Sequence, residues 1–174
     1  MKSFLPDLIV EATSLCNKMC RGCYASNLVS TKSSIEIQKL QPELFLDILK
    51  LEECIKRLNL KNKLKISIRG GEPSLHPQIS ELLNTASKFS SELYLETHGN
   101  WIINSRSSEQ YSCLLQTLFE TRSIVKVSFD SMHGTSKDTI REIISILDSK
   151  NISYKIAVTE YSLEEFLTQR KLIG

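Results

Sequence analysis

The sequence predicts an α/β fold built around a parallel sheet that closes partly into a barrel. Short apolar runs that are typical of strands alternate five times with segments that have the apolar spacing of helices. Such alternation is typical of parallel strands joined by right-handed crossovers. The chain has 174 residues, which suits one domain, whereas a complete eightfold barrel needs about 200 or more. We therefore expect a single domain over residues 1–174, a partial parallel (β/α) barrel of about five to six strand-helix units.

The expected strands are apolar runs that end at polar or glycine residues. The second is the clearest, because Leu64, Ile66 and Ile68 alternate with polar residues and the run stops at Gly70. Ligands of parallel α/β folds bind at the carboxyl ends of the strands, so the residues that follow these runs are the first candidates for a functional site. The five runs cover residues 7–12, 64–68, 93–95, 124–129 and 152–158.

The expected helices carry their apolar residues on one face. In the first, Leu44, Ile48 and Leu51 begin a stripe with steps of four and three residues, and Pro42 suits the first turn. The helices are expected over residues 42–58, 77–89, 109–120, 139–147 and 163–170. Residues 27–34 and 104–108 are expected to form loops within the domain.

Composition and charge exclude several classes of protein. Hydrophobic residues make up 41% and charged residues 24% of the chain, as in an ordinary globular domain. The formal net charge of +2 is far from that of a dedicated nucleic-acid binder, so we expect no nucleic-acid partner. The longest apolar runs fall well short of the ~20 residues that span a bilayer, and Pro6 and Asp7 interrupt the apolar start before a secretory signal can form. We therefore predict a cytoplasmic protein without a membrane partner.

Three of the five cysteines follow the first expected strand at the spacing Cys-x3-Cys-x2-Cys. An odd number of cysteines in a chain without an export signal argues for thiol or metal chemistry rather than disulfides. Soft thiolate ligands select iron–sulfur clusters, zinc or copper. Electron-transfer clusters and structural zinc sites normally take four protein ligands, so three thiolates on a four-iron cluster would leave one iron open to a substrate or cofactor. The predicted metal ligands are Cys16, Cys20 and Cys23.

Four other residues bear on this prediction. His98 and His133 follow the third and fourth expected strands, and either imidazole could complete a zinc site instead. Both histidines are also candidates for proton transfer or for contact with a substrate. Cys54 and Cys113 lie within expected helices, where we predict thiols packed in the core.

A second candidate motif, at residues 69–73, follows the second expected strand. Gly70 and Gly71 would let the backbone approach a ligand closely or adopt a positive φ, and Glu72 adds a carboxylate that could pair with an ammonium group. Glycine pairs end many strands, so this turn alone is a weak signal. Next to a cysteine loop on the preceding parallel strand, it becomes a strong one.

The sequence resembles the radical S-adenosylmethionine (radical SAM) superfamily over nearly the whole chain. The resemblance rests on Cys16-Asn17-Lys18-Met19-Cys20-Arg21-Gly22-Cys23-Tyr24 together with Gly70-Gly71-Glu72-Pro73. It implies that the three cysteines hold a 4Fe-4S cluster, whose open iron chelates the amino and carboxylate groups of S-adenosylmethionine. It also implies that the Gly-Gly-Glu turn contacts the methionyl amino group. The cofactor-binding residues implied by the resemblance are Gly22, Gly70, Gly71, Glu72, Pro73, Thr97, Ser128 and Asp130.

Two shorter matches and two departures accompany this resemblance. Family members often show Thr-Asn-Gly after the third strand and Ser-x-Asp after the fourth, and residues 97–99 and 128–130 look similar. The residue before the third cysteine is usually aromatic and contacts adenine through its backbone, whereas here it is Gly22. The family core commonly has six strand-helix units, so this chain is either a minimal domain or one that lacks a C-terminal part.

The resemblance implies a radical SAM enzyme that reductively cleaves S-adenosylmethionine to a 5′-deoxyadenosyl radical, which abstracts hydrogen from a substrate. The substrate, either a peptide or protein or a small metabolite, stays open, and no catalytic acid or base is assigned. An electron donor such as flavodoxin or ferredoxin is implied as a partner. The alternative is a non-catalytic cysteine-cluster module, for iron–sulfur electron transfer or with structural zinc. Glu72 favours the enzyme, because such a module needs no ammonium partner beside its cluster.

Overall fold

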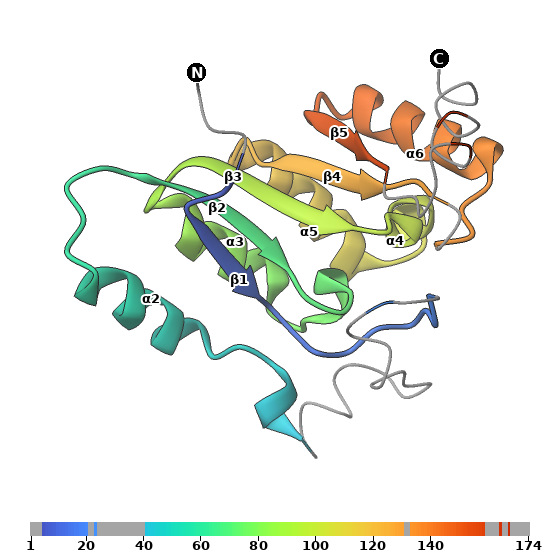
Figure 1. Ribbon diagram of the computed structural model, residues 1–174. Coiled ribbons are helices and arrows are strands. Elements are labelled where there is room, and N and C mark those ends of the chain that lie inside the picture. The colour runs from blue at the N-terminus through green and yellow to red at the C-terminus, as the bar shows by residue number, and fades with distance from the viewer. Residues whose placement is uncertain are drawn as a thin grey trace.

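A five-stranded parallel sheet organises the described part of the chain (Figure 1). The computed structural model describes residues 5–20, 23, 41–130, 133–158, 164 and 167. Each strand pairs with its neighbours in the sequence, in the order β1-β2-β3-β4-β5, so β1 and β5 form the edges. The strands are β1 (Leu8–Glu11), β2 (Leu64–Arg69), β3 (Ser90–Thr97), β4 (Ile124–Ser128) and β5 (Tyr154–Ala157).

Helices cover one face of this sheet (Figure 1). Apolar side chains from the strands and the helices pack between the two layers and form the main core. Leu82, Leu118 and Ile143, from three different helices, are fully buried there. The α-helices are α2 (Ile48–Arg57), α3 (Ile79–Ser87), α4 (Asn100–Ile103), α5 (Glu109–Glu120) and α6 (Lys137–Ser149), and the 3-10 turns are η1 (Pro42–Leu44), η2 (Pro73–Leu75) and η3 (Asn104–Arg106).

The parallel α/β character of the prediction is confirmed. All five expected strands are present, and α5 spans the residues predicted for the third helix. The described strands form a sheet with two edges, and its closure into a partial barrel stays a prediction. The loop expected over residues 27–34 and the helix expected over residues 163–170, apart from positions 164 and 167, lie outside the described residues.

The first predicted helix begins later than expected. Asp47 Oδ1 accepts hydrogen bonds from the N–H groups of Leu49 and Lys50, at 2.9 and 3.1 Å, and so caps a helix that starts at the next residue. Pro42 instead opens the separate turn η1. Residues 104–108, predicted as a loop, contain η3, which follows directly on α4.

The two isolated cysteines are exposed, so the prediction that they are core thiols is wrong. Cys54 precedes the buried Ile55 in α2, and Cys113 precedes the buried Leu114 in α5. Neighbouring residues of an α-helix point about 100° apart, because there are about 3.6 residues per turn. Apolar neighbours in the sequence therefore do not put a thiol on the buried face.

The strand residues that alternate with the core positions form a polar network. Ser67 Oγ and Lys126 Nζ both donate to Glu96 Oε1, at 2.7 and 2.8 Å. Burial alone would raise the pKa of Glu96, but these two hydrogen bonds and the positive charges of Lys126 and Arg69 together outweigh it, and the pKa is lowered. A parallel sheet that is covered on both faces has apolar strands throughout. The sheet of this chain instead presents one face that suits water or a polar ligand.

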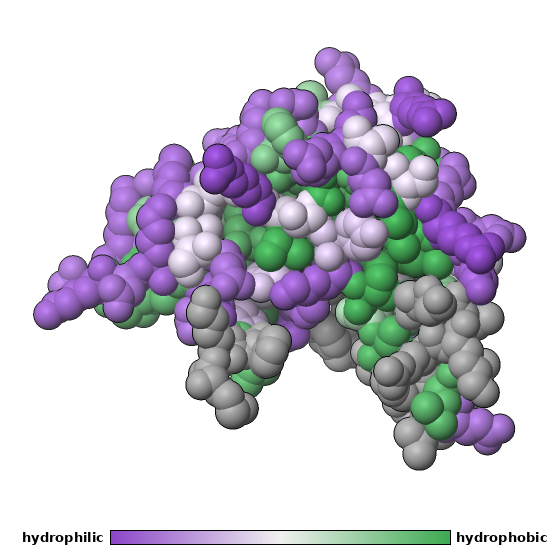
Figure 2. Space-filling view, turned by 90° about the horizontal axis from the view of Figure 1, so that it is seen from above, coloured by the Kyte–Doolittle hydropathy of each residue, from purple (hydrophilic) through white to green (hydrophobic). Residues whose placement is uncertain are grey.

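Large apolar side chains that remain exposed are scattered over several elements. Ile9 on β1, Leu49 on α2 and Phe119 on α5 are examples, and Figure 2 shows hydrophobic residues on one face of the molecule interspersed among hydrophilic ones. Single exposed apolar residues are normal for a folded protein. Among the described residues, no helix combines the length and the apolar character that crossing a bilayer would require.

Replacing Leu82 by Ala is expected to lower the free energy of unfolding by about 2–5 kcal/mol, because it leaves a cavity in a core position of 0% exposure. Leu49, which is 76% exposed, provides the matched control. The change Leu49→Ala should alter stability by no more than about 0.5 kcal/mol. Urea denaturation measures both, and equal losses would contradict the assignment of the core.

Candidate metal centre

The segment that carries the cysteines is joined to the end of β2 by backbone hydrogen bonds. After β1, the chain runs past the carboxyl ends of the neighbouring strands (Figure 1). The N–H of Gly71 donates to Thr13 O at 2.8 Å, and the N–H of Glu72 donates to Leu15 O at 2.7 Å. These bonds continue the contact between β1 and β2 beyond the sheet, so Cys16 lies next to a residue that is bonded to the glycine turn.

The two glycines of this turn are required by the chain's own backbone. A Cβ added to Gly70, whose φ is +151°, would lie 2.3 Å from Thr13 O, and one added to Gly71 would lie 2.0 Å from Leu15 O. Any side chain at either position would force the cysteine segment away from β2. The predicted close approach is therefore present, but it is an approach to the cysteine segment.

The three clustered cysteines differ in exposure. Cys16 is buried, whereas Cys20 and Cys23 are half-buried. The N–H of Lys18 donates to Cys16 Sγ at 3.4 Å, and the N–H of Cys23 donates to Cys20 O at 3.2 Å. Burial raises the pKa of the Cys16 and Cys20 thiols, and at Cys20 the Lys18 ammonium is the largest effect in the opposite direction.

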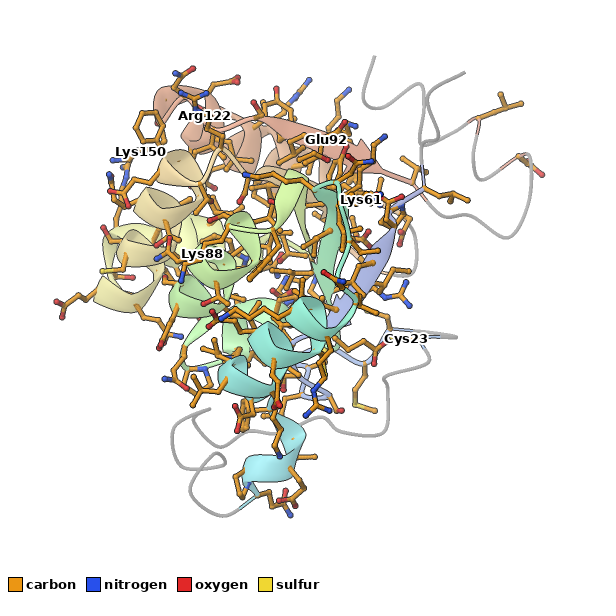
Figure 3. The ribbon with its side chains drawn as sticks, turned by 90° about the vertical axis from the view of Figure 1, so that its left-hand side faces the viewer. Cys23, Lys61, Lys88, Glu92, Arg122 and Lys150 are labelled. Carbon is orange, nitrogen blue, oxygen red and sulfur yellow. The ribbon has the colours of Figure 1, made fainter. Side chains whose placement is uncertain are left out.

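The donor set suits an iron–sulfur cluster. All three thiols are free of disulfides. Lys61 and Glu92 mark the amino-terminal side of the sheet, and Figure 3 shows Cys23 below both of them. Within the part of the chain that the structure describes, no three His, Cys, Asp or Glu side chains are arranged to hold one metal ion. A four-iron cluster does not need this arrangement, because each thiolate binds a different iron.

The carboxylate of Glu72 is buried and bonded within the chain. Its Oε1 accepts from the N–H of Ser74 at 3.1 Å and from Thr97 Oγ1 at 2.8 Å. Its Oε2 accepts from the N–H of His98 at 3.1 Å and lies 3.2 Å from His98 Nε2. Three hydrogen bonds from the chain thus reach this carboxylate, out of the about four that a carboxylate can accept. Glu72 therefore joins the ends of β2 and β3 and uses most of its acceptor capacity within the chain.

Thr97 and Trp101 also stabilise the contact between the ends of β2 and β3. Besides donating to Glu72, Thr97 Oγ1 accepts from the N–H of Gly99 and from Trp101 Nε1, both at 3.0 Å. One hydroxyl offers one donor and two acceptor sites, so these contacts use all of them. Trp101 is 2% exposed and belongs to the core. Both side chains thus support the end of β3, and neither presents a free polar group to a ligand.

His98 connects Glu72, at the end of β2, to the segment that carries the cysteines. Its Nδ1 accepts from the N–H of Asn100 at 3.1 Å, which leaves the proton on Nε2, and Nε2 donates to Asn17 Oδ1 at 2.8 Å. Burial lowers the pKa of His98, so the ring stays neutral. With both ring nitrogens in use, His98 is a poor fourth ligand for zinc. The role of Asn17 was missed by sequence reasoning, and its one signal was an amide side chain between two clustered cysteines.

The end of β4 contributes a second buried carboxylate. Asp130 is 2% exposed, and its Oδ1 accepts from the backbone N–H of His133 at 3.0 Å and from His133 Nδ1 at 2.6 Å. Lys18, in the cysteine segment, donates from Nζ to His133 O at 2.9 Å. The loops after β1 and β4 are therefore in contact across the carboxyl end of the sheet.

The other predicted cofactor-binding residues are not brought into this network. Pro73 is buried as the first residue of η2. Ser128, the last residue of β4, is half-buried and has Ala157 of β5 as its register partner. Gly22 lies outside the described residues.

His76 is a structural residue of the turn after β2. Its ring is fully buried, with Nε2 3.0 Å from Leu46 O and the N–H of Gln78 donating to Nδ1 at 3.1 Å. The ring also packs edge-on against Phe45, with 5.6 Å between ring centroids. Burial lowers the pKa of His76, which keeps the ring neutral.

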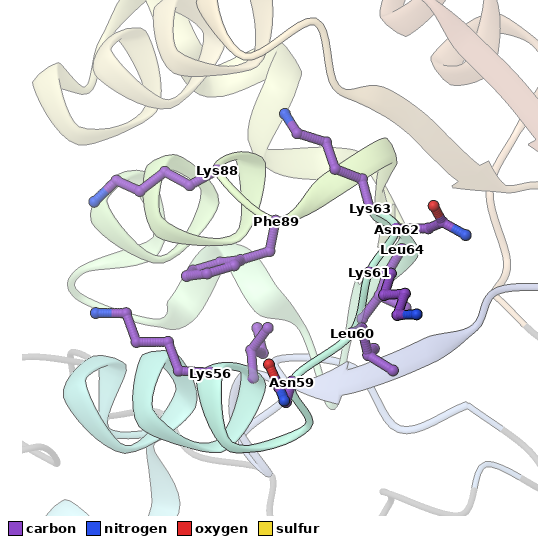
Figure 4. Close-up of a pocket in the computed structure, with 10 residues that line it drawn as sticks. Lys56, Asn59, Leu60, Lys61, Asn62, Lys63, Leu64, Lys88 and Phe89 are labelled. Atoms are coloured by element: carbon purple, nitrogen blue, oxygen red, sulfur yellow. The ribbon is translucent and has the colours of Figure 1, made fainter.

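Two hollows among the described residues lie away from the cysteines. One of about 250 Å³ opens where β2 and β3 begin, and Figure 4 shows lysine side chains around Phe89 there. Lys56 and Lys88 sit at the C-terminal ends of α2 and α3, where the helix dipole favours cations. A second hollow, of about 760 Å³, lies beside α5 and the end of α6. Neither hollow adjoins the candidate metal centre.

Replacing Gly71 by Ala is expected to displace the cysteine segment and to reduce the iron content of reconstituted protein severalfold. The added methyl would lie 2.0 Å from Leu15 O, which is backbone and cannot rotate away. The control is Gly134→Ala, since a Cβ at Gly134 meets no atom within 4 Å, although its φ of +59° adds about 1 kcal/mol of local strain. Equal iron content in the two variants would show that Gly71 does not position the cysteines.

Acidification is expected to destabilise the fold through His76. Because the folded-state pKa of His76 lies below its ordinary value of about 6.5, the unfolded chain binds this proton more readily. The stabilisation is complete above a pH of about 6.5 and falls as the pH drops below it, by at most about 1.4 kcal/mol per pH unit. Urea denaturation across this range should give a shallower slope for His76→Gln than for the wild type. Parallel slopes would contradict the assignment.

The comparisons with known proteins agree with the sulfur donor set. No match is found among curated proteins. The family model for the 4Fe-4S single cluster domain matches residues 9–142, a range that includes the three clustered cysteines and the glycine turn. This match indicates an iron–sulfur cluster domain. The chain belongs to the family of 4Fe-4S single cluster domains.

Proposed function

We propose that this iron–sulfur domain is a radical SAM enzyme in which Cys16, Cys20 and Cys23 hold the cluster and S-adenosylmethionine binds at its open iron. The observation that carries the proposal is the backbone pairing of the Gly-Gly-Glu turn with the cysteine segment, through Gly71 to Thr13 and Glu72 to Leu15. The two motifs on which the radical SAM resemblance rests are thus neighbours in space as well as being present in the sequence.

The number of available thiols supports an open coordination position. Cys54 and Cys113 are exposed on α2 and α5, in the helical layer, whereas the clustered cysteines follow β1. His98 uses both ring nitrogens within the chain. Since neither Cys54, Cys113 nor His98 supplies a fourth ligand, three thiolates on a four-iron cluster leave one iron for an external ligand.

When bound, the cluster would supply one electron to S-adenosylmethionine and so release methionine and a 5′-deoxyadenosyl radical. The chain's own residues would hold and orient the cofactors. Asn17 and His98 fix the cysteine segment, the backbone at 70–72 faces the same segment, and Asp130 and Ser128 offer polar groups at the end of β4. The substrate is a peptide or protein or a small metabolite, and an electron donor such as flavodoxin or ferredoxin reduces the cluster.

A second candidate is an iron–sulfur module that transfers electrons without cleaving S-adenosylmethionine. The observation in its favour is that most of the acceptor capacity of Glu72 is used within the chain. An electron-transfer module needs no ammonium partner at that position. The two candidates differ in whether the reduced protein consumes S-adenosylmethionine.

Anaerobically reconstituted protein, incubated with dithionite and S-adenosylmethionine, is expected to form 5′-deoxyadenosine and methionine in equal amounts. Cys20→Ala removes a proposed ligand and should abolish both the cluster and the products. Cys54→Ala is the matched control, because it removes an exposed thiol of the helical layer. Chromatographic detection of 5′-deoxyadenosine is the measurement. A wild-type protein that carries four irons and four sulfides but yields no product would favour the electron-transfer module.

A further inference from the structure

We propose that Lys18 fixes the cysteine segment to the end of β4 and, through its positive charge, raises the reduction potential of the cluster bound there. Lys18 lies between two of the proposed ligands, Cys16 and Cys20, and its side chain reaches a residue 115 positions away in the sequence. The inference rests on the cysteine ligands of the proposed function, but not on cleavage of S-adenosylmethionine.

The contact between Lys18 and the His133 carbonyl depends on the neighbouring carboxylate of Asp130. Asp130 Oδ1 accepts from both the backbone N–H and Nδ1 of His133, at 3.0 and 2.6 Å. This pair of bonds holds the His133 backbone in place, and its carbonyl oxygen lies 2.9 Å from Lys18 Nζ. A mainly buried carboxylate thus sets the position of the acceptor. The half-buried lysine is held at both ends, by its own backbone between the cysteines and by the His133 carbonyl.

The charges around the cysteines are of both signs. Lys18 is two residues from both Cys16 and Cys20, and its N–H donates to Cys16 Sγ at 3.4 Å. Asp130 accepts from the N–H of His133, whose carbonyl oxygen accepts from Lys18 Nζ. Lys18 and Asp130 are therefore an opposed pair of charges beside the proposed cluster ligands.

The charges of Lys18 and Asp130 affect the free energy of reducing the cluster. A cluster that takes one electron from a reductant such as dithionite becomes one unit more negative, with no bond broken and no proton required. The Lys18 ammonium stabilises the more negative state, and the Asp130 carboxylate destabilises it, because both charges act through the low-dielectric surroundings of partly buried groups. Charge near a cluster is one of the factors that set its potential.

The test is a potentiometric titration of the reconstituted full chain, followed by electron paramagnetic resonance, without S-adenosylmethionine. Lys18→Met should reduce the ratio of reduced to oxidised cluster at a fixed potential about tenfold, which corresponds to a shift of the reduction potential by ~59 mV to lower values for a one-electron couple. Lys18→Arg should keep the wild-type potential. Asp130→Asn should shift the potential in the opposite direction. Lys88→Met makes the same chemical change at the far end of the sheet and should have no effect.

The signs separate electrostatics from loss of structure. Both Lys18→Met and Asp130→Asn weaken the same contact, so a purely structural role would lower iron content in both and move both potentials in the same direction. That outcome would overturn the proposal, as would a Lys18→Met potential equal to that of Lys88→Met. A wild-type protein that binds no cluster would overturn the ligand assignment as well. Opposite shifts without product formation from S-adenosylmethionine would support Lys18 and reject only the proposed enzyme.

Discussion

The close backbone contact between residues 13–15 and residues 70–72 is the constraint on which the rest of the site depends. It requires two positions without side chains, because a Cβ at either one would overlap a carbonyl oxygen of the cysteine segment. With both glycines present, two hydrogen bonds carry the β1–β2 contact past the end of the sheet. The cysteine loop therefore starts from a rigid element, which is the placement that a precise metal site needs.

The same contact determines how Glu72 is used. Because its backbone is tied to Leu15, its side chain points into the space between the ends of β2 and β3, where Thr97 and His98 supply donors. His98 in turn donates a hydrogen bond to Asn17 in the segment that carries the cysteines. A buried network of this kind is stable when all its members are bonded, and losing any one leaves a buried polar group unsatisfied. The glycine turn and the segment that carries the proposed metal ligands are thus coupled through side chains as well as through backbone.

Local patterns predicted the elements well and the site's internal contacts poorly. Helix α5 matches its predicted limits because Ser108 caps it and its apolar stripe is unbroken. The prediction that Cys54 lies in the core was wrong, because a thiol gives no firm signal for either face of a helix. The donors to Glu72 from the end of β3 lie 25 and 26 residues further along the chain, and Lys18 binds a residue 115 positions away. Such pairings depend on which strand ends are neighbours, which no local periodicity contains.

The charge balance of the site offers a way to reconcile a largely bonded Glu72 with a positively charged ligand. Glu72 and Asp130 bring two buried carboxylates to the end of the sheet that carries the thiols, and the burial that lowers the pKa of His98 keeps that ring from neutralising Glu72. The field of Glu72 reaches Cys16, whose pKa burial and Glu72 both raise. In partly buried surroundings such a field acts over several ångströms without a hydrogen bond. This field would favour the ammonium group of the proposed ligand, whereas the Lys18 ammonium at the same end of the sheet acts in the opposite direction. This supports the proposed binding of S-adenosylmethionine, and it assigns to Glu72 an electrostatic contribution in addition to its structural one.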